Sequence, residues 1–188
     1  MQVVIFGSIQ TGVGLADDFS HGMIDRFRSL PMARSAVLAG RTIADLVRNI
    51  FVISLMTGVG YLIGFEIKDG VPAALEAMAI ALAFGFAFSW IAATIGMAVK
   101  NAETAQVAGF VWVFHLVFAS SIFVPIHTMP EALETFASIS PITVTVDTIR
   151  GLVLGHDVEE SRLQALAWIA GILIVFVPLA VRNYRKNV

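Results

Sequence analysis

The 188-residue sequence contains no cysteine, which excludes disulfides, thiolate metal ligands and cysteine nucleophiles. It is also poor in charge: Asp, Glu, Lys and Arg make up 14% of the residues, against about 25% in an average soluble domain. Hydrophobic residues reach 57%. A chain with this few charged residues cannot cover a water-facing surface with polar groups. Lipid must therefore solvate much of the chain. The net charge of -2 indicates neither a nucleic acid nor an acidic partner.

Several sequence motifs of enzymes are missing as well. No GxxxxGK[ST] phosphate-binding loop occurs, so we expect the chain neither to bind nor to hydrolyse ATP and not to be an enzyme in itself. The patterns HExxH and GxSxG are also absent. The four histidines have no metal-ligand spacing, so we expect no metal and no cofactor; they are His21, His115, His127 and His156.

Long hydrophobic segments dominate what is present. Four of them approach or exceed the roughly 20 residues that a membrane span needs: residues 46–65, 73–99, 105–126 and 163–181. Residues 1–16 are apolar but shorter, and we interpret them as the end of a membrane helix whose beginning is missing, through truncation or a mis-chosen start. The sequence therefore predicts an all-α fold, a single polytopic transmembrane helix bundle with four complete spans plus the end of an N-terminal one.

The distribution of Lys and Arg predicts the orientation. Nine of the 12 basic residues fall within residues 17–48, at Lys100 or in the tail 182–188. The other three are Lys68, Arg150 and Arg162. Because cytoplasmic loops carry the excess of Lys and Arg, we expect a cytoplasmic C-terminus in the inner or plasma membrane.

Residues 17–45 form the predicted cytoplasmic segment. Its apolar positions 19, 23, 24, 27 and 30 have helical spacing, which predicts a short amphipathic helix that ends at Pro31. Three interpretations are open: topogenic charge, a helix lying in the lipid headgroups, or a docking element for a soluble partner. In the last, Phe27 and Leu30 would fill a groove while Arg26 and Arg28 pair with its rim. The residues alone favour the first interpretation.

Residues 127–162 form the predicted external segment. It is long for a loop and still apolar, so we expect it to be partly helical and to pack onto the bundle or dip into the membrane edge.

Polar residues within the membrane are functional candidates because a charge at mid-membrane costs about 2.5–3.5 kcal/mol. Glu76 and His115 are such residues, and with Arg150 of the predicted external segment they are the candidates for lining a path through the membrane or for a structural polar role. For His115 we favour a neutral ring that is hydrogen-bonded to a neighbouring helix over a proton relay with Glu76. Gly60 and Gly64 have the GxxxG spacing that lets two helices approach closely.

A longer pattern then resembles a known family. It comprises the run Asp25-Arg26-Phe27-Arg28-Ser29-Leu30-Pro31-Met32-Ala33-Arg34 with Gly40-Arg41 and Asp45, then Phe123-Val124-Pro125, Met129-Pro130, Ser140-Pro141-Ile142-Thr143, Asp147-Thr148-Ile149-Arg150 and Pro178-Leu179-Ala180-Val181-Arg182. This order resembles the permease subunits of type-2 ABC exporters, most closely the daunorubicin-resistance group of drug exporters. The likeness covers almost the whole chain.

The resemblance implies a six-helix permease that here lacks its first helix and part of its second. Two permease subunits, identical or homologous, would pair with two cytoplasmic ABC ATPase subunits and export lipophilic drugs, antibiotics or lipids by alternating access. Asp18 to Leu30 matches the position of the family's coupling helix, which makes Asp25, Arg26, Phe27, Arg28, Leu30 and Pro31 the candidate ATPase contacts. Membrane lipids and the lipophilic substrate would be the remaining partners.

Two other functions stay open at this point. One is an ion-coupled secondary transporter or channel without an ATPase partner, which would need buried ionisable pairs or broken helices. The other is a structural or assembly protein of the membrane without transport.

Overall fold

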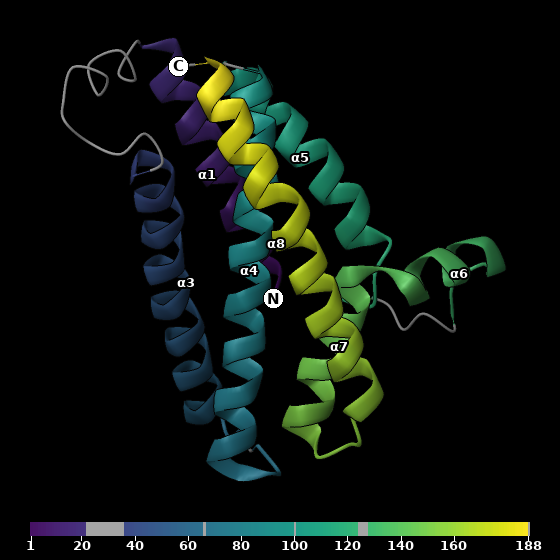
Figure 1. Cartoon of the computed structure of the whole chain (residues 1–188). Coiled ribbons are helices and arrows are strands. Elements are labelled where there is room, and N and C mark those ends of the chain that lie inside the picture. Colours follow the sequence, from purple (N-terminus) through teal and green to yellow (C-terminus); the bar gives the residue numbers. More distant parts are fainter. Residues whose placement is uncertain (22–35, 66, 100, 124–127, 188) are drawn as a thin grey trace.

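The computed structural model describes residues 1–21, 36–65, 67–99, 101–123 and 128–187. Over these ranges the chain forms helices and no strand, which confirms the all-α prediction. The helices, as labelled in Figure 1, are α1 (Gln2–Ser20), α3 (Ala36–Leu62), α4 (Gly70–Val99), α5 (Ala102–Phe118), α6 (Glu131–Ile139), α7 (Pro141–Leu154) and α8 (Glu159–Asn187).

Three helices are long and apolar enough to cross a membrane, namely Leu38–Leu62, Gly70–Val99 and Glu159–Tyr184. The bent pair α6 and α7 becomes a fourth candidate if its 67° bend is taken as a break within one span. These are the proportions of a polytopic membrane protein, as predicted.

Helix α4 is the centre of the bundle and packs against α1, α3, α5, α7 and α8. Its sequence is apolar around the whole circumference, so burial on every side leaves few polar groups without a partner. Of its most apolar 18-residue stretch 61% is buried, against 11% for α3. Phe84 and Phe88 lie at the core with ring centroids 4.5 Å apart, and Trp112 of α5 stacks on Phe88 at 5.6 Å.

Glycine brings α1 and α4 into close contact. A Cβ atom built on Gly96 would lie 2.1 Å from the carbonyl oxygen of Gly12, and one built on Gly12 would lie 2.4 Å from that of Ala92. Small residues allow such backbone approach between membrane helices. The predicted GxxxG pair does not serve this purpose, because Gly64 lies beyond the end of α3 in a turn, with φ +93°.

Helix α5 is shorter than the segment 105–126 from which we expected a complete span. It begins after Asn101, whose side chain accepts a hydrogen bond from the backbone N–H of Thr104, and it ends at Phe118. At 1.5 Å per residue its 17 residues extend roughly 26 Å, less than the hydrocarbon thickness of about 30 Å. The Ser120 hydroxyl donates to the carbonyl of Val117, 2.5 Å away, and so satisfies one of the free carbonyls at the helix end.

The segment predicted to be external contains α6 and α7. In Figure 1 α6 projects sideways from the bundle, whereas α7 turns back along it. Helix α7 starts with Pro141, packs against α4 and α8, and ends at Gly155 in the left-handed conformation. The expectation that this segment packs onto the bundle is therefore confirmed for α7, whose Ile142 is fully buried.

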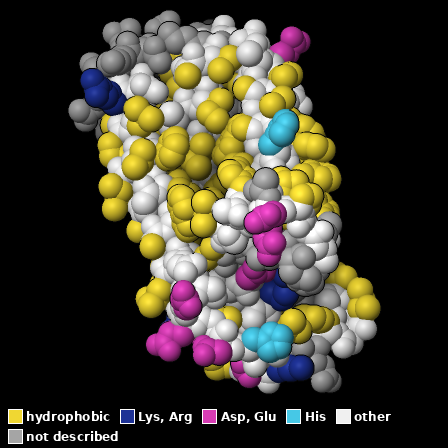
Figure 2. All heavy atoms as spheres, turned by 90° about the vertical axis from the view of Figure 1, so that its right-hand side faces the viewer, with side chains coloured by type: hydrophobic (Ala, Val, Ile, Leu, Met, Phe, Trp, Pro, Cys, Tyr) yellow, Lys and Arg dark blue, Asp and Glu magenta, His cyan; other side chains and the backbone are white. Residues whose placement is uncertain are grey.

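The two ends of the bundle differ. Helix α1 ends, α3 begins and α8 ends at the top of Figure 1, which we call the α1–α3 end. The α3–α4 and α7–α8 connections lie at the opposite end. On the face shown in Figure 2, hydrophobic side chains cover the middle, while acidic and basic side chains gather near that opposite end. This apolar band with charged ends is typical of a membrane protein.

Candidate functional site

The predicted ATPase contacts lie outside the described residues, since all six fall between positions 22 and 35. What the structure does describe is the pair of helices on either side of this segment. Helix α1 reaches Ser20 just before it, and α3 starts at Ala36 just after it. Polar contacts concentrate where these two helices face each other.

The first of these contacts is an ion pair between α1 and α3. Arg41 donates from Nε and Nη2 to Oδ2 of Asp18, at 2.9 Å and 2.7 Å. The Asp18 side chain is 9% exposed and that of Arg41 is 37% exposed. An ion pair with one partner this buried and two hydrogen bonds is stronger than an exposed pair, and it ties the end of α1 to the first turns of α3.

The second contact joins three helices, two turns further along α3. Arg48 pairs with Asp45 on the same helix and donates to the backbone carbonyl of Gly7 on α1, 2.7 Å away. The other carboxylate oxygen of Asp45 accepts a hydrogen bond from the hydroxyl of Ser89 on α4. Because the Asp45 side chain is only 3% exposed, its charge is stabilised chiefly by these neighbours rather than by water.

Glycine at two positions of α1 makes room for both guanidinium groups. A Cβ atom on Gly14 would lie 1.9 Å from Nη1 of Arg41, and one on Gly7 would lie 2.8 Å from Nη2 of Arg48. Any other residue would push these arginines away from the α1 backbone. Within the described residues, the buried Nδ2 of Asn49 beside this cluster has no hydrogen-bond partner.

The same residues border a polar groove of about 530 Å³ between α1 and α3. Asp17, Arg41, Asp45 and Arg48 supply charged groups of both signs to its walls, and Ala102 at the start of α5 completes it. The groove therefore lies towards the α1–α3 end, next to the predicted coupling segment.

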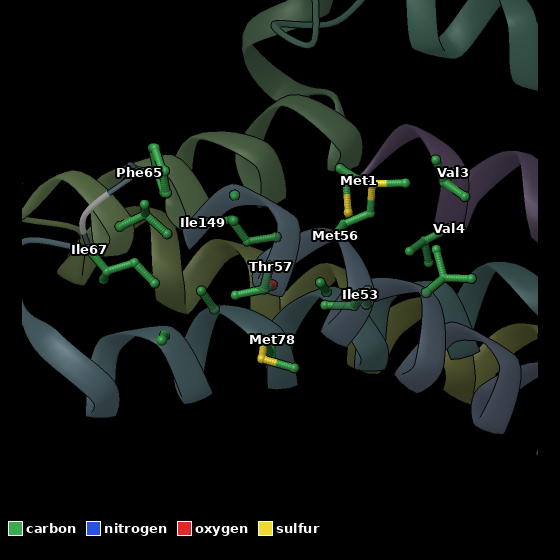
Figure 3. Close-up of a pocket in the computed structure, with 16 residues that line it drawn as sticks. Met1, Val3, Val4, Ile53, Met56, Thr57, Phe65, Ile67, Met78 and Ile149 are labelled. Atoms are coloured by element: carbon green, nitrogen blue, oxygen red, sulfur yellow. The ribbon is translucent and has the colours of Figure 1, made fainter. Parts of the chain in front are cut away.

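An apolar cavity of about 280 Å³ lies further along the same face of α3 (Figure 3). Figure 3 shows side chains from four helices around it: Val4 of α1, Met56 of α3, Met78 of α4 and Ile149 of α7. Thr57 is among the few lining residues with a polar side-chain atom. The face that α3 turns to the bundle is thus polar in one half and apolar in the other.

The structure does not bring the three predicted path residues together. His115 is exposed, and its Nδ1 lies 2.6 Å from the Val111 carbonyl of its own helix, so the expected hydrogen bond to a neighbouring helix is not the one observed. Glu76 pairs instead with Arg162 of α8, Oε1 to Nη1 3.3 Å, and both side chains are about two-fifths exposed. No proton relay between Glu76 and His115 is formed by these contacts.

Arg150 belongs to a separate network that joins α7 to the end of α5. Its Nη1 donates to Oδ1 of Asp147 at 3.0 Å, and its Nη2 donates to the carbonyl of Ser121 at 3.0 Å. The Ser121 hydroxyl donates to the same carboxylate oxygen at 2.8 Å, and the Ser121 backbone N–H donates to the Thr143 hydroxyl at 3.2 Å. These hydrogen bonds hold α7 against the turn that follows α5.

The sequence interpretation missed the polar network of α3. We expected residues 17–45 to be cytoplasmic, with the stretch 35–48 rising helically into the membrane and the next span at residues 46–65; in the structure the apolar helix Leu38–Leu62 contains Arg41, Asp45 and Arg48. The signal was present in their spacing, since positions 41, 45 and 48 share one face of a helix. Among the residues that the structure describes, no three His, Asp or Glu side chains are grouped closely enough to hold a metal ion.

Comparison with known proteins gives one family. The family model described as ABC-2 type transporter matches residues 1–154. The daunorubicin resistance ABC transporter permease protein DrrB1 of Streptomyces coeruleorubidus is 31% identical over 187 residues, which is 100% of this chain and 66% of that protein. The probable doxorubicin resistance ABC transporter permease protein DrrC of Mycobacterium tuberculosis is 29% identical over 184 residues, 97% of this chain and 66% of that protein. The chain thus spans just under two thirds of the length of these relatives. No solved structure matches.

Proposed function

Since the chain belongs to the ABC-2 type transporter family, we propose that it is a membrane-spanning permease subunit of an ATP-driven exporter. The observation that carries this proposal is the family match over residues 1–154 together with the apolar helices of the bundle. The chain would provide the path through the membrane, and a separate subunit would bind and hydrolyse ATP.

The ATPase would dock at the α1–α3 end. The segment between α1 and α3 carries Arg26, Phe27, Arg28 and Leu30, which combine apolar anchors with guanidinium groups able to pair with an acidic rim. The ion pair between Asp18 and Arg41 joins α1 to α3, the two helices that flank this segment in the sequence. This arrangement supports the docking interpretation over topogenic charge alone. It also requires the α1–α3 end, and with it the C-terminus, to face the cytoplasm.

We propose lipophilic compounds, drugs or lipids, as substrates. The names of the relatives refer to resistance to daunorubicin and to doxorubicin. The apolar cavity of Figure 3 and the predominance of aliphatic and aromatic side chains along the helices are compatible with such molecules. Nothing in this cavity selects one compound over another, because its walls offer few hydrogen-bonding groups.

A second permease copy or homologue would complete the path. Helix α5 exposes a row of aromatic rings suited to pack against another helix, with centroid separations of 6.3 Å between Phe110 and Phe114 and 4.2 Å between Phe114 and Phe118. All three side chains are exposed in the single chain. Aromatic residues are enriched at protein interfaces, although lipid can also cover such a row.

Co-purification tests the proposal. The chain is expressed with the ABC ATPase encoded beside it, extracted from membranes and purified, and the amount of ATPase retained per chain is measured. We expect the unmodified chain and Phe27→Leu to retain the ATPase, and Phe27→Asp to release it, because a carboxylate cannot occupy an apolar groove without a partner. Retention of the ATPase by Phe27→Asp at the unmodified level would refute the docking assignment. Failure of the unmodified chain to retain any ATPase would refute the exporter proposal.

Energy coupling distinguishes the alternative, an ion-coupled secondary transporter. An ATP-driven exporter loses transport when ATP is depleted while the proton gradient is maintained. An ion-coupled transporter keeps it and fails when the gradient is collapsed. The buried carboxylates of Asp18 and Asp45 and the bent pair α6–α7 would also suit an ion-coupled transporter, so the family match is what favours the first mechanism.

A further inference from the structure

We infer that Arg41 and Arg48, seated on Gly14 and Gly7, form an arginine–glycine clamp that makes α1 and α3 move as one body during transport. The inference rests on the proposed function, since it assigns a role in energy coupling to residues outside the predicted ATPase contacts. The clamp residues would position the helices and would touch neither ATP nor substrate.

The first argument is the register of the two helices. Gly7 and Gly14 are seven residues apart on α1, and Arg41 and Arg48 are seven residues apart on α3. The helices run in opposite directions, so the later glycine meets the earlier arginine. Both pairs fit the same spacing of two helical turns, and in both the guanidinium lies where a Cβ atom would otherwise be, 1.9 Å at Gly14 and 2.8 Å at Gly7. The two matched contacts let both guanidinium groups lie against the α1 backbone in one register of α1 and α3.

The second argument is charge. Each arginine of the clamp has its own carboxylate: Asp18 for Arg41 and Asp45 for Arg48. Asp18 reaches across from α1, while Asp45 also accepts a hydrogen bond from Ser89 and so connects the clamp to α4. Sliding α3 along α1 would separate Arg41 from Asp18 and Arg48 from the Gly7 carbonyl at the same time.

The third argument is the position of the clamp on α3, which packs against α4 as well as against α1. Only 11% of its most apolar stretch is buried, against 61% for α4, and its outward side chains such as Phe51 and Leu55 are exposed. The clamp lies in the half of α3 nearest the predicted coupling segment. A force applied to that segment therefore acts on α1 and α3 together, and the clamp prevents them from responding separately.

The absence of cysteine in the chain allows a direct test. Gln10 on α1 and Ala44 on α3 both border the groove beside the clamp and belong to neither ion pair. The variant Gln10→Cys/Ala44→Cys is assembled with its ATPase in vesicles. Its two cysteines are then cross-linked with a short bismaleimide whose length matches the distance between them. ATP-driven transport is measured before and after joining, with the two single-cysteine variants as controls for the reagent.

We expect the joined protein to transport at no less than about half the rate of the unjoined protein, because the clamp already keeps the two helices together. Loss of transport on joining, with the single-cysteine controls unaffected, would show that α1 and α3 must separate and would overturn the inference. If the unjoined protein shows no ATP-driven transport, the proposed function itself fails, and the clamp role falls with it.

Removing the clamp provides the complementary measurement. Arg41→Gln and Gly14→Val should each lower the amount of substrate moved per ATP hydrolysed, by about tenfold, which is within the usual range of coupling free energies. ATPase retention should stay unchanged. The reciprocal exchange Asp18→Arg/Arg41→Asp restores the ion pair and should recover transport per ATP at least in part, which a general folding defect would not. A constant ratio of transport to hydrolysis in Arg41→Gln would contradict the clamp.

Discussion

The close contact between α1 and α4 gives the sharpest prediction about stability. Replacing Gly96 by alanine adds one methyl group at the point where the two backbones meet. That carbon would lie 2.1 Å from the carbonyl oxygen and 2.9 Å from the Cα atom of Gly12. Neither atom belongs to a flexible side chain, so the contact can be relieved only by moving one helix away from the other.

The size of the effect follows from this displacement. An ordinary carbon–oxygen contact is about 3.4 Å or more, so the helices must separate by about 1 Å at the crossing. A gap of 0.5–1 Å forfeits roughly a quarter to a half of the dispersion energy of the atoms that face it. Overpacking of this kind costs about 1–3 kcal/mol. For a chain of this size each kcal/mol lowers Tm by roughly 2–4 °C.

Thermal unfolding of the purified protein in detergent, followed by the loss of the monodisperse peak, measures the change. Gly171→Ala is the matched control, because it lies in α8 with nothing within 4 Å of the added Cβ atom. Alanine has the higher helix propensity, so the control should unfold at the same temperature or slightly above. If Gly96→Ala unfolds no earlier than Gly171→Ala, the close approach of α1 and α4 is not as the structure has it.

Three further predictions concern the polar networks. Asp45→Ala should destabilise the fold by about 1.5–3 kcal/mol because it removes the buried acceptor of the hydrogen bonds from Arg48 and Ser89, while Asp45→Asn should cost less; denaturant unfolding compares the two, and equal costs would argue against the ion pair. Glu76→Gln should change stability by no more than about 1 kcal/mol, since both partners of its ion pair are about two-fifths exposed, and a larger loss of Tm would mean a buried role. Asp147→Ala should loosen α7 from Ser121 and cost about 0.5–1.5 kcal/mol, since the carboxylate is partly exposed; this should be visible as faster amide hydrogen exchange in α7 while exchange in α4 is unchanged, and uniform exchange would contradict it.

The sequence was sufficient for the helices that lie in the apolar layer. Their hydrophobic runs predicted α4 and α8 because a span needs about 20 apolar residues regardless of its neighbours. Pro141 and Gly155 likewise mark the beginning and the end of α7, since proline fits the first helical turn and glycine the left-handed cap.

Features that depend on a partner helix could not be read in the same way. Hydrophobicity placed Asp45 in the cytoplasmic segment and Arg48 near the start of the next hydrophobic segment, because it does not register that each charge meets a counterion or a carbonyl inside the bundle. Gly12 and Gly96 are far apart in sequence, so their contact had no local signal, whereas Gly60 and Gly64 had the signal and no contact. The end of α5 at Phe118 could not be predicted for the same reason. Ser120 and Ser121 do not interrupt a hydrophobic segment in the sequence, yet their hydrogen bonds end the helix and connect it to α7.

The measurement that tests the central proposal most directly is ATP-dependent uptake of doxorubicin into inside-out membrane vesicles that contain the chain and its ATPase. An exporter moves the compound into such vesicles when ATP is supplied, and we expect uptake to stop when ATP is replaced by a non-hydrolysable analogue and to continue when the proton gradient is abolished. Uptake that does not depend on ATP and stops when the proton gradient is abolished would contradict the exporter proposal and identify the chain as an ion-coupled transporter.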